Sequence, residues 1–270
     1  MLEERYAGTR GHEMTELGGE LERIVGFNRY LEERCSERIF SSFLATALLC
    51  ESLPLVRDRN YLRVEDGGAS ASELASMADR VLGSAGLSHR RVFADSSEIA
   101  DRLAPQFENL SWKAEGLLVM THDGRVEEEQ LPLVAEVEIE EMYPFWEEEN
   151  RQRHPESAEL VRQLTEQNEF VARSIDCQYF ARRLDGRVVS GCQLYSRGGT
   201  AQIETVGTLE EYRNRGLASS VVKRAVAEAF GSGHDLVWLL AEEDNWPKAL
   251  YAKLGFNPAG RFCAFTRGTS

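Results

Sequence analysis

Apolar and polar positions near the start of the chain follow a helical period and then change to strand-like runs. Residues 13–38 place apolar side chains every three or four positions among many glutamates. This spacing predicts a long amphipathic helix, interrupted at Gly26. Residues 40–64 are typical of extended segments, broken at Leu53-Pro54.

Residues 58–121 alternate between short apolar runs and amphipathic segments. The helix predicted at 70–82 has two candidate N-cap residues, Ser70 and Ser72. The whole region runs strand, helix, strand, helix, strand, at residues 60–64, 70–82, 90–95, 96–107 and 112–121. An acidic stretch with a terminal proline follows, and we interpret residues 122–131 as a linker.

The second half of the chain has a clearer pattern. Its predicted order is β-α-α-β-β-β-α-β-α-β, in which Asp185-Gly186 and Gly198-Gly199 mark two hairpin turns. Three strands joined by turns imply antiparallel pairing, whereas the strand–helix–strand step around 202–242 implies one parallel pair. The expected fold class is therefore α/β (α+β), with a mixed, mostly antiparallel sheet and one parallel βαβ step.

Composition limits the classes of function. The 270 residues allow one large domain or two of ordinary size, and the net charge of −14 argues against a general nucleic-acid binder. An acidic surface suits cationic small molecules or basic protein tails as substrates, and it suits plain solubility equally. No apolar run approaches the roughly 20 residues that span a bilayer.

Cysteine and histidine usage gives no sign of disulfides or metal. The five cysteines are dispersed and form no CxxC pair, which predicts reduced thiols in a soluble, cytoplasmic protein. The five histidines show no HxxxH or HExxH spacing, so we expect no metal site. The polar start of the chain lacks the apolar region of a secretion signal.

The stretch EYRNRGLASS, residues 211–220, sets two arginines and a glycine before an aliphatic run. A helix N-terminus presents unpaired N–H groups and partial positive charge, so this arrangement suits an anion. An ordinary exposed loop with arginines would have the same composition. The stretch alone does not separate the two interpretations.

The context of this stretch resembles the signature of the GNAT superfamily of acyl-CoA-dependent N-acetyltransferases. Arg213-Asn214-Arg215-Gly216-Leu217-Ala218 is similar to the family's Arg/Gln-x-x-Gly-x-Gly/Ala motif, which follows a strand and opens a helix. The later LYAKLGF at 250–256 is similar to a second family element. Arg80-Val81-Leu82-Gly83-Ser84-Ala85 fits the six-residue pattern too, but it ends a predicted helix, where the dipole is negative. The resemblance covers about residues 132–267.

The resemblance implies acetyl-CoA as cosubstrate and a splayed cofactor cleft. Amides from Asn214 through Gly216, Leu217 and Ala218 to Ser219 would bind the pyrophosphate, with charge added by Arg213 and Arg215. Backbone groups of the preceding strand would pair with the pantetheine arm, at Val206, Gly207 and Thr208. Gly207 removes a side chain there, although it would equally relieve packing.

The resemblance also implies catalytic roles for two residues. Tyr251 matches the family's tyrosine near the sulfur, which would protonate the leaving thiolate, and a buried packing aromatic is the alternative. Glu204 is the candidate general base, with an exposed strand glutamate as its alternative. Asn245 lies near a cofactor-contacting asparagine of the family, but the usual spacing falls on Asp244, and helix capping explains an Asp-Asn pair equally well.

Three parts are therefore expected. Residues 1–121 form an amino-terminal α/β domain, 122–131 a linker, and 132–270 the catalytic N-acetyltransferase domain. The first part is either a degenerate GNAT-like half or an unrelated α/β cap. The resemblance implies transfer of an acetyl group to a primary amine on a small molecule or protein, without metal, nucleic acid or membrane. A non-catalytic acyl-CoA-binding module is the alternative. The sequence leaves the acceptor and the oligomeric state open.

Overall fold

The computed structural model describes residues 4–124 and 133–268 of the chain, with side chains described from residue 19 onward. The helices are α1 Glu4–Arg34, α2 Ala71–Ser84, α3 Ser97–Asn109, α4 Ile139–Arg153, α5 Ala158–Ala172, α6 Leu217–Gly231 and α7 Pro247–Lys253. The strands are β1 Arg38–Ser41, β2 Ala45–Leu49, β3 Tyr61–Val64, β4 His89–Ala94, β5 Lys113–His122, β6 Val134–Val137, β7 Asp176–Leu184, β8 Arg187–Arg197, β9 Thr200–Thr208, β10 Leu236–Glu242 and β11 Phe256–Gly268. Two 3-10 turns, η1 Arg57–Arg59 and η2 Glu210–Tyr212, complete the list.

All the strands join one mixed sheet. Their order is β1-β2-β3-β4-β11-β5-β10-β9-β8-β7-β6, with parallel pairing between β3 and β4 and between β9 and β10. The other neighbours are antiparallel. The predicted fold class is confirmed, including the parallel step across α6. A second parallel step, across α2, lies in the amino-terminal half.

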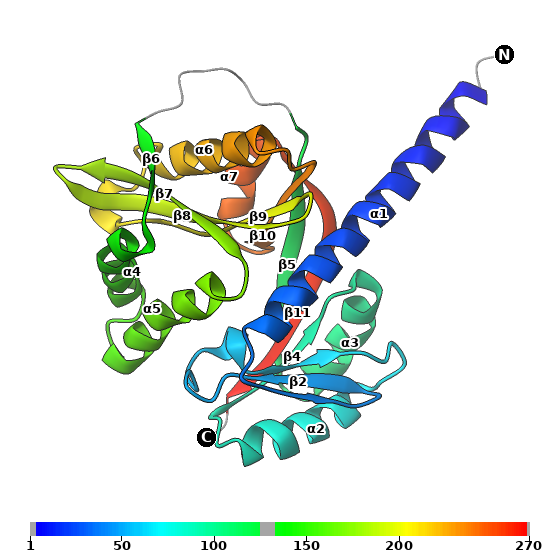
Figure 1. Cartoon of the computed structure of the whole chain (residues 1–270). Coiled ribbons are helices and arrows are strands. Elements are labelled where there is room, and N and C mark those ends of the chain that lie inside the picture. The colour runs from blue at the N-terminus through cyan, green and yellow to red at the C-terminus, as the bar shows by residue number, and fades with distance from the viewer. Residues whose placement is uncertain (1–3, 125–132, 269–270) are drawn as a thin grey trace.

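Two long strands connect the halves of the molecule. β11 comes from the end of the chain, yet it lies between β4 and β5, and β5 pairs in turn with β10. Both strands run between the two lobes in Figure 1. The sheet is therefore continuous across the predicted boundary. Of the predicted linker, residues 125–131 lie outside the described residues, and the division into 1–121 and 132–270 stays a prediction.

Each half has its own core. α2 and α3 pack on the amino-terminal strands around Leu74, Phe107 and Phe265, whereas α6 and α7 pack on the carboxy-terminal strands around Val222 and Phe256. A third cluster lies beneath α1 on the opposite face of the sheet. The helices therefore leave a region between α1, α5 and the centre of the sheet, which contains the cavity described below.

α1 is continuous through Gly26, so the predicted interruption is wrong. A glycine inside a helix costs about 1 kcal/mol relative to alanine. Ile24, Phe27 and Leu31 flank this position and are buried. Burying each such side chain stabilises the structure by about 1.5–3 kcal/mol, which outweighs the local cost.

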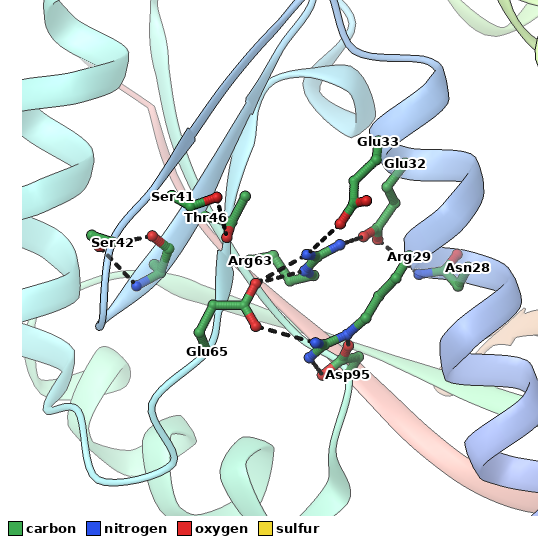
Figure 2. Close-up of polar contacts among 11 residues, drawn as sticks. Asn28, Arg29, Glu32, Glu33, Ser41, Ser42, Thr46, Arg63, Glu65 and Asp95 are labelled. Atoms are coloured by element: carbon green, nitrogen blue, oxygen red, sulfur yellow. Dashed lines mark hydrogen bonds and ion pairs between the residues drawn. The ribbon is translucent and has the colours of Figure 1, made fainter.

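Charged side chains hold α1 against the amino-terminal strands (Figure 2). Arg63 of β3 is buried and pairs with Glu32 at 2.8 Å and with Glu33 at 2.9 Å, both on α1. Arg29 of α1 pairs with Asp95 at 2.6 Å. Because buried charges require such partners, this network fixes the position of α1 along the sheet.

The N-cap of α2 offers a small stability test. Ser70 is the N-cap and forms a capping box with Glu73, whereas Ser72 lies inside the first turn. We expect Ser70→Ala to lower the free energy of unfolding by about 1 kcal/mol, because one amide at the helix start loses its partner. Ser72→Ala is the matched control and should change it by less than about 0.5 kcal/mol. Urea denaturation followed by circular dichroism compares the two, and equal losses would contradict the assignment of Ser70 as the cap.

Candidate active site

Strand β9 carries a β-bulge where it separates from β10. Gly191 and Gln193 of β8 are two positions apart, but their partners Gly207 and Glu204 are three apart, so β9 contains one extra residue. Thr205, inside the bulge, has a φ of 51°. β9 pairs with β10 only through residues 200–202. The rest of β9 therefore faces an opening toward β10, which confirms the predicted splay.

The entrance to α6 presents a row of backbone donors. Asn214 and Gly216 have positive φ values of 61° and 74°. In the part of the chain that the structure describes, no group accepts a hydrogen bond from the amides of Asn214, Arg215, Gly216, Leu217, Ala218 and Ser219. Unpaired donors at the positive end of a helix form a suitable anion site. This loop directly follows the splayed part of β9.

The two arginines of the motif are exposed and make local contacts. The Arg213 Nε donates to the backbone oxygen of Thr208 at 3.1 Å, and its guanidinium pairs with Glu210 at 3.3 Å. Arg215 donates to the backbone oxygen of Glu211 at 2.8 Å. They add positive charge beside the row of amides while their own hydrogen bonds shape the loop.

Gly207 accommodates a buried carboxylate. A Cβ at position 207 would lie 2.3 Å from an oxygen of Glu149, a buried residue of α4. Arg153 donates to the same Glu149 oxygen at 2.6 Å. Burial raises the pKa of Glu149, and Arg153 opposes the rise. The close contact with Glu149 favours the second interpretation of Gly207, in which the glycine relieves packing. Nothing in the sequence indicated Glu149.

Part of the backbone around Gly207 already forms hydrogen bonds within the protein. Ser190 of β8 donates its hydroxyl hydrogen to the Gly207 oxygen at 2.8 Å, and Thr208 lies beside that hydroxyl at 2.9 Å. Val206 is half-buried at the margin of the α6 core. These three residues line the splayed segment, as the resemblance implies.

Glu204 lies half-buried in a cavity of about 570 Å³. Its carboxylate accepts a hydrogen bond from the Gln202 side chain at 2.5 Å. Burial raises the pKa of Glu204 to about 7, although the Thr205 amide and the charge of Arg59 lower it. A carboxylate with this pKa changes protonation near neutral pH and has the properties of a general base.

The amino-terminal half supplies much of the cavity wall. Charged residues from four of its elements line the cavity, namely Glu32 of α1, Asp58 and Arg59 of η1, Arg91 of β4, and Lys113 and Glu115 of β5. α5 closes another side with Gln167 and Asn168, and β10 contributes Leu240 and Glu242. No sequence motif marks these residues, because elements distant in the chain bring them together.

Tyr251 is buried on α7. Burial, with the nearby charge of Glu204, raises the pKa of its hydroxyl above the ordinary value. The group therefore remains protonated at neutral pH. No described residue forms a hydrogen bond with this hydroxyl, so its proton is not committed to another side chain.

Asn245 is exposed at the start of α7. Its amide donates to Glu242 at 2.8 Å, and its oxygen accepts from the Trp246 N–H at 2.8 Å. The N-cap of α7 is Trp246, which makes no side-chain cap bond. Asn245 therefore lies one position before the N-cap, so the prediction that it caps this helix is wrong by one position.

The described residues were also expected to lack metal ligands and membrane spans. No cluster of histidine, cysteine, aspartate or glutamate in residues 4–124 and 133–268 is arranged to hold a metal ion. Among the described helices, none is both long and apolar enough for a membrane span.

A comparison with family models matches the carboxy-terminal part of the chain. Residues 137–256 match the model of the acetyltransferase (GNAT) family. A comparison with curated proteins returned no match. A functionally unknown conserved protein from Staphylococcus epidermidis has a similar structure, with 13% identity and a TM-score of 0.70 over 87% of this chain and 95% of that one.

Two further structures extend the likeness to the whole fold. A GCN5-related N-acetyltransferase from Kribbella flavida is 16% identical, with a TM-score of 0.62 over 93% of this chain and 96% of that one. A tandem GNAT protein from the clavulanic acid biosynthesis pathway is 14% identical, with a TM-score of 0.51 over 78% and 75%. Because the Kribbella flavida match covers 93% of this chain, the likeness in fold includes the amino-terminal half.

Proposed function

We propose, from the premise that residues 137–256 form a GNAT acetyltransferase domain, that this chain transfers an acetyl group from acetyl-CoA to a primary amine. The observation that best supports this proposal is the arrangement of groups along β9. The opened part of β9 has Glu204 in a cavity at one end and the unpaired amides of α6 beyond the other. A nucleotide-bearing thioester and an amine acceptor would thus meet along the same strand.

The residues present fit the cosubstrate. The amides from Asn214 to Ser219 would hold the pyrophosphate, and Arg213 and Arg215 would add charge. Acetyl-CoA supplies an activated thioester. Glu204 would take the proton that the attacking amine loses, and Tyr251 would give its proton to the departing thiolate. Cleavage of the C–S bond and formation of the C–N bond would give an amide and a free thiol, and return of the proton from Glu204 to the Tyr251 phenolate by way of solvent would restore both residues.

The cellular setting of this reaction is also part of the proposal. All five cysteines are free thiols, four of them buried. Such thiols persist in reducing compartments, so we place the protein in the cytoplasm.

Release of free thiol from acetyl-CoA, measured against a panel of primary amines, tests the proposed activity. Thermal denaturation with acetyl-CoA alone is the parallel measurement, since a bound cosubstrate raises the melting temperature. Stabilisation without turnover on any amine would instead favour a non-catalytic acyl-CoA-binding module. Absence of both effects at millimolar acetyl-CoA would overturn both interpretations.

Removing the Tyr251 hydroxyl should slow the reaction. We expect Tyr251→Phe to lower kcat by about 10- to 100-fold, a modest loss for a general acid because a thiol of pKa near 8.5 is a fair leaving group. The melting shift with acetyl-CoA should be unchanged, since the hydroxyl has no role in holding phosphates. Tyr143→Phe is the control, because Tyr143 bonds Glu169 outside the cavity at 3.2 Å. Equal rates for wild type and Tyr251→Phe would remove Tyr251 from the mechanism.

A further inference from the structure

The cavity next to Glu204 contains a cation that has no partner. Arg59 lies on η1, in the amino-terminal half, and its side chain lines the cavity. No described residue accepts a hydrogen bond from its guanidinium, and no carboxylate of the described residues lies within the 4.0 Å of an ion pair. The Nε of Arg59 is buried as well as unpaired.

The other arginines around this cavity behave differently. Arg91 pairs with Asp58 at 2.7 Å and with Glu115 at 3.0 Å. Arg63, behind the wall, pairs with Glu32 at 2.8 Å. Three carboxylates that line the cavity with Arg59, those of Glu32, Asp58 and Glu115, are thus already paired with other arginines.

An unpaired guanidinium in such a place is costly. Arginine cannot lose its charge, and its five N–H donors require acceptors when water is restricted. The planar fork of donors matches the two oxygens of a carboxylate or phosphate. Arg59 therefore has the properties of a receptor for an anionic group that enters the cavity.

Glu204 faces the same cavity from the opposite half of the molecule. Both side chains line it, and the positive charge of Arg59 opposes the rise that burial causes in the pKa of Glu204. Gln202, beside Glu204, is almost fully buried and its Oε1 has no hydrogen-bond partner among the described residues. The cavity therefore contains both a carboxylate suited to an amine and a guanidinium suited to an anion.

We infer that the acceptor is a zwitterionic amine, which places its amino group at Glu204 and a carboxylate or phosphate on Arg59. The inference rests on the proposed acetyl transfer and adds the class of acceptor to it. It gives the amino-terminal half a defined task, because η1 supplies the residue that selects substrates. The cavity of about 570 Å³ has room for an amino acid with its side chain.

Matched acceptors test the inference directly. The probes are β-alanine against propylamine, O-phosphoethanolamine against ethanolamine, and phenylalanine against phenethylamine, each assayed for kcat/KM by thiol release. We expect kcat/KM for at least one anion-bearing amine to exceed that of its partner by about 10- to 100-fold. A charge-assisted hydrogen bond contributes a difference of this size. The pair showing the preference distinguishes carboxylate from phosphate.

Variants connect the preference to Arg59. Arg59→Met should raise KM for the preferred zwitterion by about 10- to 100-fold and leave KM unchanged for the matched amine that lacks the anionic group. Arg59→Lys should keep part of the preference for the zwitterion, because lysine retains a positive charge but lacks the planar fork of donors. Arg57→Met is the control, since Arg57 is exposed on the same turn and does not line the cavity. A preference that survives Arg59→Met, or no preference in any pair, overturns the inference.

Failure of the inference can be separated from failure of the proposed activity. Isothermal titration of the three zwitterions in the presence of desulfo-CoA measures acceptor binding without turnover. Binding that Arg59→Met weakens would support the anion site even if no acetyl transfer occurred. Turnover at equal rates within all three matched pairs would support the proposed activity while refuting the role of Arg59.

Discussion

Glu204→Gln lowers kcat/KM for an amine acceptor by about 10²- to 10⁴-fold, the usual contribution of a positioned general base. Glutamine keeps the shape of the side chain and its hydrogen-bonding oxygen, but it takes up no proton. The melting shift with acetyl-CoA should remain, because Glu204 lies at the acceptor end of the opening. Glu242→Gln is the matched control, a second carboxylate that lines the cavity but is exposed.

The pH dependence of the same pair of proteins gives a second test. The pKa of Glu204 is about 7 in the folded chain, so the base is active above that pH. We expect kcat/KM of the wild type to rise as pH increases through about 7, and this limb to be absent in Glu204→Gln. A rise in kcat/KM that comes from deprotonation of the acceptor amine itself would persist in both the wild type and Glu204→Gln. An identical profile for both proteins would exclude Glu204 as the base.

Stability measurements test whether unfolding could cause the expected loss of activity in Glu204→Gln. The folded pKa of Glu204 lies above its ordinary value of 4.5, so the folded chain holds this proton more tightly. Stability from this group is therefore present at low pH and decreases as pH rises toward 7. Glu204→Gln removes this loss and should be at least as stable as wild type at pH 8. An inactive but stable variant separates a chemical defect from a folding defect.

Changing the α6 entrance should abolish cosubstrate binding. We expect Arg215→Glu combined with Gly216→Val to weaken acetyl-CoA binding at least about 100-fold, since several charge-assisted bonds of about 1.5–3 kcal/mol each are lost. Arg215→Glu adds a charge that repels phosphate. Gly216 has a φ of 74°, which a β-branched residue rarely adopts, so valine displaces the amides. Isothermal titration with acetyl-CoA measures the loss.

The second match to the six-residue pattern, residues 80–85 at the end of α2, is a decoy that provides the control. Arg80→Glu with Gly86→Val repeats the two substitutions at an exposed arginine and at a glycine that also has a φ of 74°. These positions lie near the end of α2, where no row of free amides begins. Equal losses of acetyl-CoA affinity in both double variants would mean that the α6 loop has no specific role.

Local patterns predicted the secondary-structure elements and the position of the motif, because helices, strands and turns depend largely on the residues within them. The apolar period, the cap at Ser70 and the turn glycines act over a few residues, which is why the order of strands and helices from 132 to 268 could be predicted. The same local information separated the motif at 213–218 from the decoy at Arg80, since one opens a helix and the other lies at a helix end.

The tertiary structure decided what surrounds the motif. β11 lies between β4 and β5, and the cavity joins η1, α1 and α5 to β9, although these segments are distant in the chain. Arg59 is one of three charges in the sequence RDRN, and nothing local distinguishes it from Arg57. Only packing shows that Arg91 takes the carboxylate of Asp58 and leaves Arg59 unpaired. Burial and pairing depend on the whole fold, so these properties of the site could not be predicted from the sequence alone.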